Sequence, residues 1–199
     1  MYKELFSAIA IILTFMALLP YLASVVREQI KPHVFSWIIW ASTTFIVFLA
    51  QLADDAGVGA WPIGISGGIT FVIAIIAFIK RGDISISKMD WGFSIVAMSL
   101  LPLWYFTDDP LWAVLILTTV DLLGFGPTFR KSYYFPHDEK LGLFALMAAR
   151  NLISVLALEN YSLTTLFFPV AVSIACIVFI IMVSYRRGLN KEALNKKGI

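Results

Sequence analysis

The chain has 199 residues, of which 60% are hydrophobic and only 14% are charged. A soluble globular domain is about half apolar and about one quarter charged, so this composition excludes that class and indicates an integral membrane protein. The net charge of +2 gives no indication of a nucleic-acid partner, and the single cysteine, Cys176, excludes a disulfide framework.

Seven apolar segments follow one another along the chain, each close to the roughly 20 residues that a helix needs to cross a bilayer. Lipid cannot satisfy free backbone N–H and C=O groups, so each segment is predicted to be a helix. The predicted fold class is therefore all-α, a polytopic membrane protein with seven transmembrane helices. The predicted spans are 5–26, 34–53, 58–79, 91–107, 111–129, 141–158 and 162–185, and 91–107 is the shortest.

Basic residues gather on one side of the predicted membrane. The connections after the first, third and fifth spans, together with the C-terminal segment, hold thirteen of the fifteen Lys and Arg residues. Only Lys3 lies on the opposite side, with Glu4, Asp54, Asp55, Asp108, Asp109 and Glu159. Because basic residues accumulate on the cytoplasmic side, we expect the N-terminus outside and the C-terminus inside. Short connections and the lack of a recognisable signal peptide favour a prokaryotic inner membrane.

The last three spans repeat the first three at a nearly constant offset. We therefore predict two three-helix bundles, 1–82 and 109–188, joined by a linker helix within 83–108 and followed by a basic tail, 189–199. Because a single linker helix, an odd number of membrane crossings, separates the two bundles, both have the same orientation in the membrane. This is a parallel repeat about an axis along the membrane normal. Both halves are present in one chain, so a monomer is sufficient to form a central cavity, although a homo-oligomer remains open. The matching residues are Leu13-Thr14, Leu18-Leu19, Pro32-His33, Trp61–Ser66 and Arg81-Gly82 with Leu117-Thr118, Leu122-Leu123, Pro136-His137, Phe168–Ser173 and Arg187-Gly188.

This organisation resembles the SWEET sugar transporters and the wider PQ-loop superfamily. The first span ends in Leu19-Pro20-Tyr21-Leu22, and a short basic turn leads to Lys31-Pro32-His33. Tyr21 stands where the PQ-loop motif has glutamine, and in the second half, Gly124-Phe125-Gly126-Pro127, the proline is displaced and glutamine is again missing. The resemblance implies a bundle of three, one and three helices that works as an alternating-access carrier. Sorting receptors also share this fold, which leaves a receptor or scaffold as the alternative.

One face of the second span carries polar and aromatic side chains. Trp37, Trp40, Thr44 and Gln51 follow helical spacing among mostly aliphatic neighbours. Flat indole rings beside hydrogen-bonding groups predict a solute-binding face. The alternative is an interfacial aromatic belt, where tryptophan is common. The Trp-x-x-Trp spacing also resembles the nicotinamide riboside transporters.

Asp121 and Arg150 lie near the centres of neighbouring apolar spans. A charge at that depth costs about 2.5–3.5 kcal/mol on insertion scales, which favours a function. We predict that the two approach each other, either as part of a solute site or as a structural ion pair between two helices. In a solute site, Arg150 would bind an anionic group, or Asp121 would take up a proton. Asn151, equivalent by the repeat to Val47, is predicted to face the central axis.

Small residues and prolines complete the predicted carrier. Ser66 and Ser173 occupy equivalent positions and supply hydroxyl groups, or alternatively serve only close helix packing. Pro20, Pro127, Pro62 and Pro169 fall at related places and are predicted hinges, since proline removes a backbone donor from a helix. Proline is also common in membrane helices without any such role.

No enzymatic chemistry is indicated. His33 and His137 are poor candidates for a metal site without a cluster of Cys, His or carboxylate ligands, and the sequence has no phosphate-binding glycine loop. We predict no cofactor and no metal. The predicted function is a transporter for a small polar organic solute such as a sugar, a nucleoside or a small carboxylate, with the lipid bilayer as its other partner.

Overall fold

The structure is a computed structural model that describes residues 2–80, 88, 91–92, 95 and 110–196. These residues confirm the all-α prediction for the part of the chain that they cover. The helices are α1 (Tyr2–Val26), α2 (Val34–Ala53), the short 3₁₀ helix η1 (Gly57–Ala60), α3 (Trp61–Ile79), α5 (Pro110–Tyr134), α6 (Leu141–Leu156) and α7 (Leu163–Lys196). Five of them are long and apolar enough to cross a membrane, which makes the chain a polytopic membrane protein.

The prediction of seven transmembrane helices is wrong for the described residues, which form six α-helices. The predicted fourth span, 91–107, and the linker segment, 83–108, lie almost wholly outside the described residues. In addition, α6 has only 16 residues, and at 1.5 Å per residue it extends about 24 Å, less than the roughly 30 Å of a hydrocarbon core. The helix α7 is longer than predicted, because it continues to Lys196 through most of the expected basic tail.

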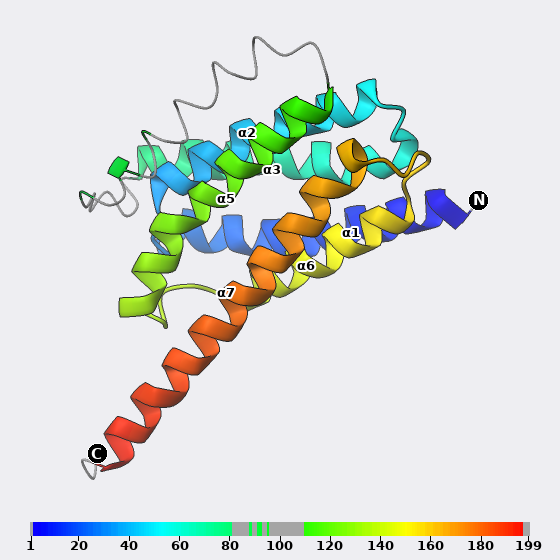
Figure 1. Cartoon of the computed structure of the whole chain (residues 1–199). Coiled ribbons are helices and arrows are strands. Elements are labelled where there is room, and N and C mark those ends of the chain that lie inside the picture. Colours follow the sequence, from blue (N-terminus) through cyan, green and yellow to red (C-terminus); the bar gives the residue numbers. More distant parts are fainter. Residues whose placement is uncertain (1, 81–87, 89–90, 93–94, 96–109, 197–199) are drawn as a thin grey trace.

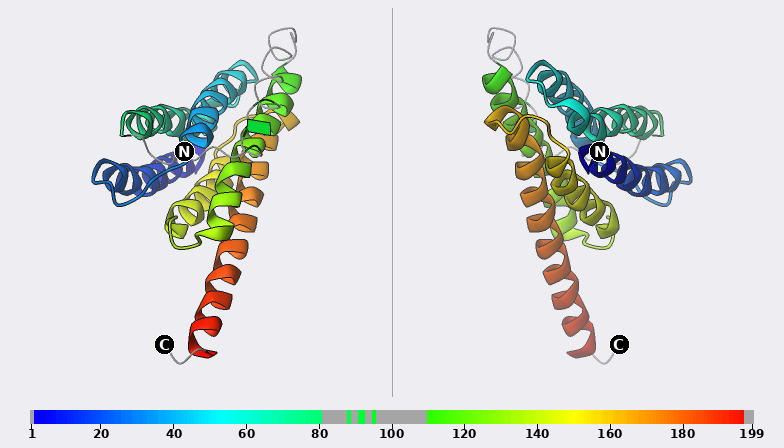
Figure 2. Two further views of the ribbon diagram at one scale, coloured as in Figure 1. Left: turned by 90° about the vertical axis from the view of Figure 1, so that its left-hand side faces the viewer. Right: turned by 90° about the vertical axis from the view of Figure 1, so that its right-hand side faces the viewer.

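The helices form two groups of three, which we call the first triplet (α1–α3) and the second triplet (α5–α7). Figure 2 shows the two groups side by side, the first in blue to teal and the second in green to red. Within the first triplet α3 packs against both α1 and α2, and within the second α7 packs against both α5 and α6. Between the triplets α1 packs against α6 and α2 against α5. If α1 corresponds to α5 and α2 to α6, every one of these contacts has an equivalent.

The two triplets also meet at both ends of the bundle. At the end that carries most of the basic side chains, which we call the basic end, the Tyr21 hydroxyl near the end of α1 donates to Glu139, just after α5. This contact shows that α1 and α5 run in the same direction. At the acidic end, Ser162 Oγ donates to Asp54 Oδ2 at 2.5 Å, and the Val58 amide donates to Glu159 Oε1 at 3.3 Å. Hydrogen bonds therefore join the two triplets at both ends of the bundle.

The outer surface of the bundle is apolar. Large hydrophobic side chains stay exposed along the outward faces of the helices, among them Ile12, Phe71, Ile75, Ile174 and Ile181. A soluble monomer rarely exposes so large an apolar surface, whereas a bilayer covers it. The interior combines a hydrophobic core with buried hydroxyl, amide and charged groups.

Three of the four predicted hinge prolines lie inside helices, Pro20 in α1, Pro127 in α5 and Pro169 in α7. The carbonyls of Pro20 and Pro169 accept hydrogen bonds at 2.8 Å from the serine hydroxyls four residues later, which belong to Ser24 and Ser173. Pro62 differs, because it occupies the first turn of α3. A proline there breaks no helical hydrogen bond, since the first amides of a helix have no internal partner.

Candidate functional site

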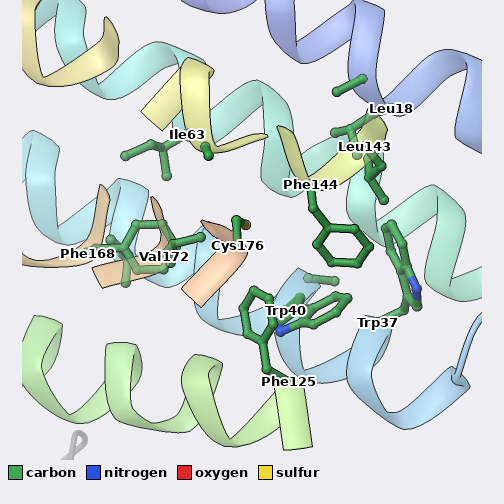
Figure 3. Close-up of a cluster of buried hydrophobic side chains, with 14 of the residues drawn as sticks. Leu18, Trp37, Trp40, Ile63, Phe125, Leu143, Phe144, Phe168, Val172 and Cys176 are labelled. Atoms are coloured by element: carbon green, nitrogen blue, oxygen red, sulfur yellow. The ribbon is translucent and has the colours of Figure 1, made fainter. Parts of the chain in front are cut away.

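A buried cavity of about 50 Å³ lies between the two triplets. A water needs roughly 10–15 Å³ of such space, so the cavity has room for a few waters. Helices from both triplets contribute to its wall, and Figure 3 shows a cluster of buried hydrophobic side chains that includes several of the lining residues, among them Trp40, Phe125 and Phe144. The lining residues are Leu18, Trp37, Trp40, Thr44, Ser66, Thr70, Asp121, Phe125, Leu143, Phe144, Met147, Arg150, Phe168, Val172 and Cys176.

Aromatic rings form one side of this central cavity. Trp37 and Trp40 of α2 meet edge to face with ring centres 5.5 Å apart, and Phe125 of α5 lies 4.8 Å from Trp40. Phe144 of α6 completes the group, 6.4 Å from Phe125 (Figure 3). Both tryptophans are buried. Their rings therefore face the interior and each other, away from the position that an interfacial aromatic belt occupies.

Asp121 is held by α2 of the other triplet. The Thr43 hydroxyl donates a hydrogen bond to its carboxylate, and the Trp40 indole Nε1 donates to its backbone carbonyl at 3.1 Å. Gly124, one helical turn further along α5, permits this approach. A Cβ atom at Gly124 would lie 3.0 Å from both Trp40 Nε1 and Ile39 Cγ2, closer than ordinary contact.

Arg150 is almost completely buried, with 1% of its surface exposed. Its Nη2 donates to Ser66 Oγ at 3.3 Å and approaches the Met147 sulfur at 3.8 Å. Its Nε and Nη1 have no hydrogen-bond partner among the described residues. A guanidinium carries five N–H donors in a fixed fork, so most of the hydrogen-bonding capacity of this side chain is unused in a place without bulk water.

The predicted direct approach of Asp121 and Arg150 does not produce an ion pair among the described residues. Both side chains line the same cavity, but each is hydrogen bonded to a hydroxyl of the first triplet: Asp121 accepts from Thr43, and Arg150 donates to Ser66. Their attraction therefore acts across the cavity. A structural ion pair that locks α5 against α6 is not what the geometry provides.

The structure brings six of the nine predicted binding residues to the central cavity: Trp37, Trp40, Thr44, Ser66, Asp121 and Arg150. The other three lie elsewhere. Gln51 donates from Nε2 to the Thr165 carbonyl at 2.9 Å near the acidic end. Ser173 donates to the Pro169 and Ala148 carbonyls and so joins α6 to α7.

Asn151, the third of these residues, follows Arg150 in the sequence. It is fully buried but does not line the cavity. Both atoms of its side-chain amide lack a hydrogen-bond partner among the described residues. A buried amide without partners costs about 1–3 kcal/mol. Asn151 and Arg150 are therefore adjacent residues of α6 whose buried side chains both have polar atoms without a hydrogen-bond partner among the described residues.

The sequence reasoning missed several lining residues, above all the aromatic pair Phe125 and Phe144. The repeat contains a signal for one of them. The offset that relates Leu13 to Leu117 also relates Trp40 to Phe144, and both rings lie at the cavity. Thr43 was also missed. It lies about one helical turn after Trp40, but it is not on the face of the second span that was predicted to bind solute.

No group of three or more His, Cys, Asp or Glu side chains that could hold a metal ion is present within the described ranges. Known proteins add no assignment, because no family model, curated protein sequence or solved structure matches this chain. The central cavity and its chemistry are therefore the basis for a functional interpretation.

Proposed function

We propose that this protein is a membrane transporter for a small polar organic solute, which binds in the central cavity and crosses by alternating access. The cavity lies where the two triplets meet, and the triplets pack through equivalent contacts. Movement of one triplet against the other exposes such a cavity first to one side of the membrane and then to the other. The resemblance of the sequence to SWEET and PQ-loop proteins supports the same mechanism.

One observation carries the proposal, the guanidinium of Arg150. It is buried at the cavity with two of its nitrogens unpartnered in the described part of the chain. Burying a charge without a partner is costly, and the cost is offset only by an opposite charge and by hydrogen bonds. A carboxylate or phosphate of a solute supplies both, because it can accept two parallel N–H bonds from the guanidinium fork.

The other lining groups fit a small organic acid. The rings of Trp40, Phe125 and Phe144 offer apolar contact to a carbon skeleton, and the hydroxyl of Thr44 offers a hydrogen bond. Asp121 lines the same cavity and provides a counter-charge for Arg150 while no solute is bound, although the two side chains form no direct ion pair. A small carboxylate is therefore favoured over a neutral sugar among the solutes that the sequence suggested.

The closed state suggests what has to change during transport. The contacts Thr43–Asp121 and Ser66–Arg150 both join the first triplet to the second. Separation of the triplets breaks these contacts, and a hydroxyl can then turn to a solute or to water. We propose the orientation that the basic loops predict, with the basic end in the cytoplasm and the N-terminus outside, in a prokaryotic inner membrane.

The first test is a thermal-stability screen of the purified protein against carboxylates, phosphates, sugars, nucleosides and amino acids. A ligand that binds only the folded state raises the melting temperature as its concentration exceeds the dissociation constant. We expect acids to stabilise the wild type and Arg27→Gln, a control that removes an exposed arginine. The effect should vanish in Arg150→Gln and weaken in Arg150→Lys, because a lysine lacks the bidentate fork.

Uptake of the stabilising acid into proteoliposomes then separates a carrier from a receptor or scaffold. A carrier moves the solute in the wild type and stops in Arg150→Gln, although that variant still folds. Binding without uptake would indicate a receptor. If no compound in the panel shifts the melting temperature, the transporter proposal is contradicted.

A further inference from the structure

A second cavity lies at the basic end, outside the central one. It has a volume of about 650 Å³ and is bordered by α1, by the α5–α6 connection, by α6 and by Arg187 of α7. We call it the outer cavity. Its rim carries the exposed side chains His137 and Lys140, whereas Tyr21 and Glu139 in its wall are buried.

The two cavities adjoin each other. Leu143 lines both of them. Tyr21, which borders the outer cavity, stacks on Trp37, which borders the central cavity, with ring centres 4.9 Å apart. A displacement of Tyr21 and Leu143 would therefore connect the outer cavity with the central one.

Glu139 holds this wall in place. Its Oε2 accepts a hydrogen bond from the Tyr21 hydroxyl at 3.3 Å, and its Oε1 lies 3.6 Å from Lys131 Nζ. Lys131 also donates to the backbone carbonyl of Lys31 in the α1–α2 connection. The Glu139 carboxyl group thus links α1 of the first triplet to α5 of the second, and the link must break if the triplets separate at this end.

The remaining charged groups around Glu139 come from its own segment and from α7. Arg187 donates from Nη2 to the Glu139 carbonyl and from Nε to the Pro136 carbonyl, both at 2.8 Å. Asp138, the preceding residue, adds a repulsive charge. Lys140 turns away and donates to Ser24 Oγ at 2.6 Å. Lys131 is therefore the cation that reaches the carboxyl group itself among the residues that the structure describes.

Burial dominates the chemistry of this carboxyl group. It raises the pKa of Glu139 from its ordinary value of 4.5 to about 7, while the charge of Lys131 and the hydrogen bonds from Tyr21 and Lys131 act in the opposite direction. When the wall opens, water reaches the carboxyl group and its pKa returns toward the ordinary value. A proton therefore binds the closed wall more tightly than the open one, and by linkage proton release favours opening.

We propose that Glu139 is a proton-binding site that controls a gate between the outer and central cavities: the protonated side chain keeps the gate closed, and loss of the proton opens it. This inference rests on the proposed transport function, because the gate would admit the solute of the central cavity. The group that binds the proton, Glu139, then lies at the basic end and outside the proposed solute site.

The single cysteine of the chain provides the test, because Cys176 lines the central cavity and is buried. The rate at which methyl methanethiosulfonate, a small neutral thiol reagent, modifies Cys176 reports access to that cavity without any added solute. The wild type and Glu139→Gln are compared at each pH, so that the intrinsic pH dependence of the thiol cancels in the ratio. Glutamine resembles the protonated acid and can still accept the Tyr21 hydrogen bond.

We expect the rate in the wild type, divided by that in Glu139→Gln, to rise about tenfold between pH 6 and pH 8, as follows from a carboxyl pKa of about 7 when closed and 4.5 when open. Asp138→Asn removes the neighbouring exposed carboxylate, the smallest of the influences on Glu139, and should shift the profile only slightly toward lower pH. Tyr21→Phe keeps the stacking ring but loses the hydrogen bond, and should be modified faster than the wild type at pH 8. Tyr21→Phe also tests the gate if the Glu139→Gln protein does not fold.

A ratio that stays constant with pH, or Tyr21→Phe labelling at the wild-type rate, would overturn the gate. This failure is separable from failure of the transport proposal. If acids bind and are transported while the labelling ratio stays flat, the gate alone is wrong. If labelling follows Glu139 but no solute is bound or carried, the gate controls access to a cavity that is not a transport site.

Discussion

Asp121 and Arg150 line the same cavity, yet each is hydrogen bonded to a hydroxyl of the opposite triplet, Asp121 to Thr43 of α2 and Arg150 to Ser66 of α3. Both charges belong to the second triplet and both hydroxyls to the first. The charges therefore hold the two halves together through neutral partners. Such contacts are individually weaker than a buried ion pair, and a hydroxyl can act as donor or acceptor, which suits an interface that has to open and close.

Thr43→Val tests the contribution of the Thr43–Asp121 contact. Valine has nearly the same shape as threonine but leaves the buried carboxylate without its hydrogen bond. We expect the free energy of unfolding to fall by about 1.5–3 kcal/mol, as for a hydrogen bond to a charged group. Thr43→Ser keeps the hydroxyl and should lose distinctly less. Equal losses in the two variants, measured by unfolding in mixed detergent micelles, would refute the role of the hydroxyl.

Gly124→Ala tests the close approach of α2 and α5. The added Cβ would meet Trp40 Nε1 and Ile39 Cγ2 at 3.0 Å, so the helices must move apart or the Trp40–Asp121 hydrogen bond must lengthen. We expect a lower melting temperature and a changed tryptophan emission. Gly68→Ala is the matched control, because nothing lies within 4 Å of a Cβ there, and alanine is the better helix former by about 1 kcal/mol. A Gly124→Ala protein as stable as Gly68→Ala would count against tight packing at this point.

Pro127→Ala tests the hinge. Alanine restores a backbone N–H inside α5 and removes the clash of the proline ring, so the helix becomes straighter and stiffer. We expect a higher melting temperature together with slower solute uptake. Pro62→Ala, at the first turn of α3, should change uptake little, because no internal hydrogen bond is gained there. If both variants transport at the wild-type rate, bending at Pro127 is not part of the cycle.

Stability should depend on pH through Glu139. Burial raises the pKa of this acid to about 7 in the folded protein, against 4.5 ordinarily. The folded state therefore binds the proton more tightly than the unfolded state. The stabilisation is complete below pH 4.5 and is lost as the pH rises to about 7, on the order of 3 kcal/mol in total. Unfolding measured across this window should show a smaller loss in Glu139→Gln, and a parallel decline in both proteins would exclude Glu139 as its source.

The helices could be predicted closely from the sequence where hydropathy and loop polarity agree. The predicted span 34–53 coincides with α2, and 58–79 corresponds to η1 followed by α3. The ends of α5 and α7 were predicted too early, because charged and polar residues such as Arg130 and Lys131 suggested loops. A helix that leaves the hydrocarbon core keeps its internal hydrogen bonds, so hydropathy marks the core and not the end of the helix.

The site could be predicted in part. Buried charges and tryptophans in apolar spans identified Asp121, Arg150, Trp37 and Trp40, because their cost in lipid makes them conspicuous. Phe125 and Phe144 were missed, since phenylalanine in a membrane helix is unremarkable until packing shows which way it faces. Glu139 was missed for a related reason. In the sequence it is one acid in a polar connection, and only the fold buries it against Tyr21 and Lys131.

The helix α7 continues well past the rest of the bundle (Figure 1). At the point where it leaves, Arg186 and Arg187 donate to the carbonyls of Tyr133, Pro136 and Glu139. These hydrogen bonds attach the segment that contains Glu139 to the start of the projecting part of α7. Because the displacement produced by a tilt grows with distance from the pivot, a small tilt of α7 at this point moves its C-terminal end much further. A change inside the bundle can therefore be measured as a displacement of the projecting end of α7.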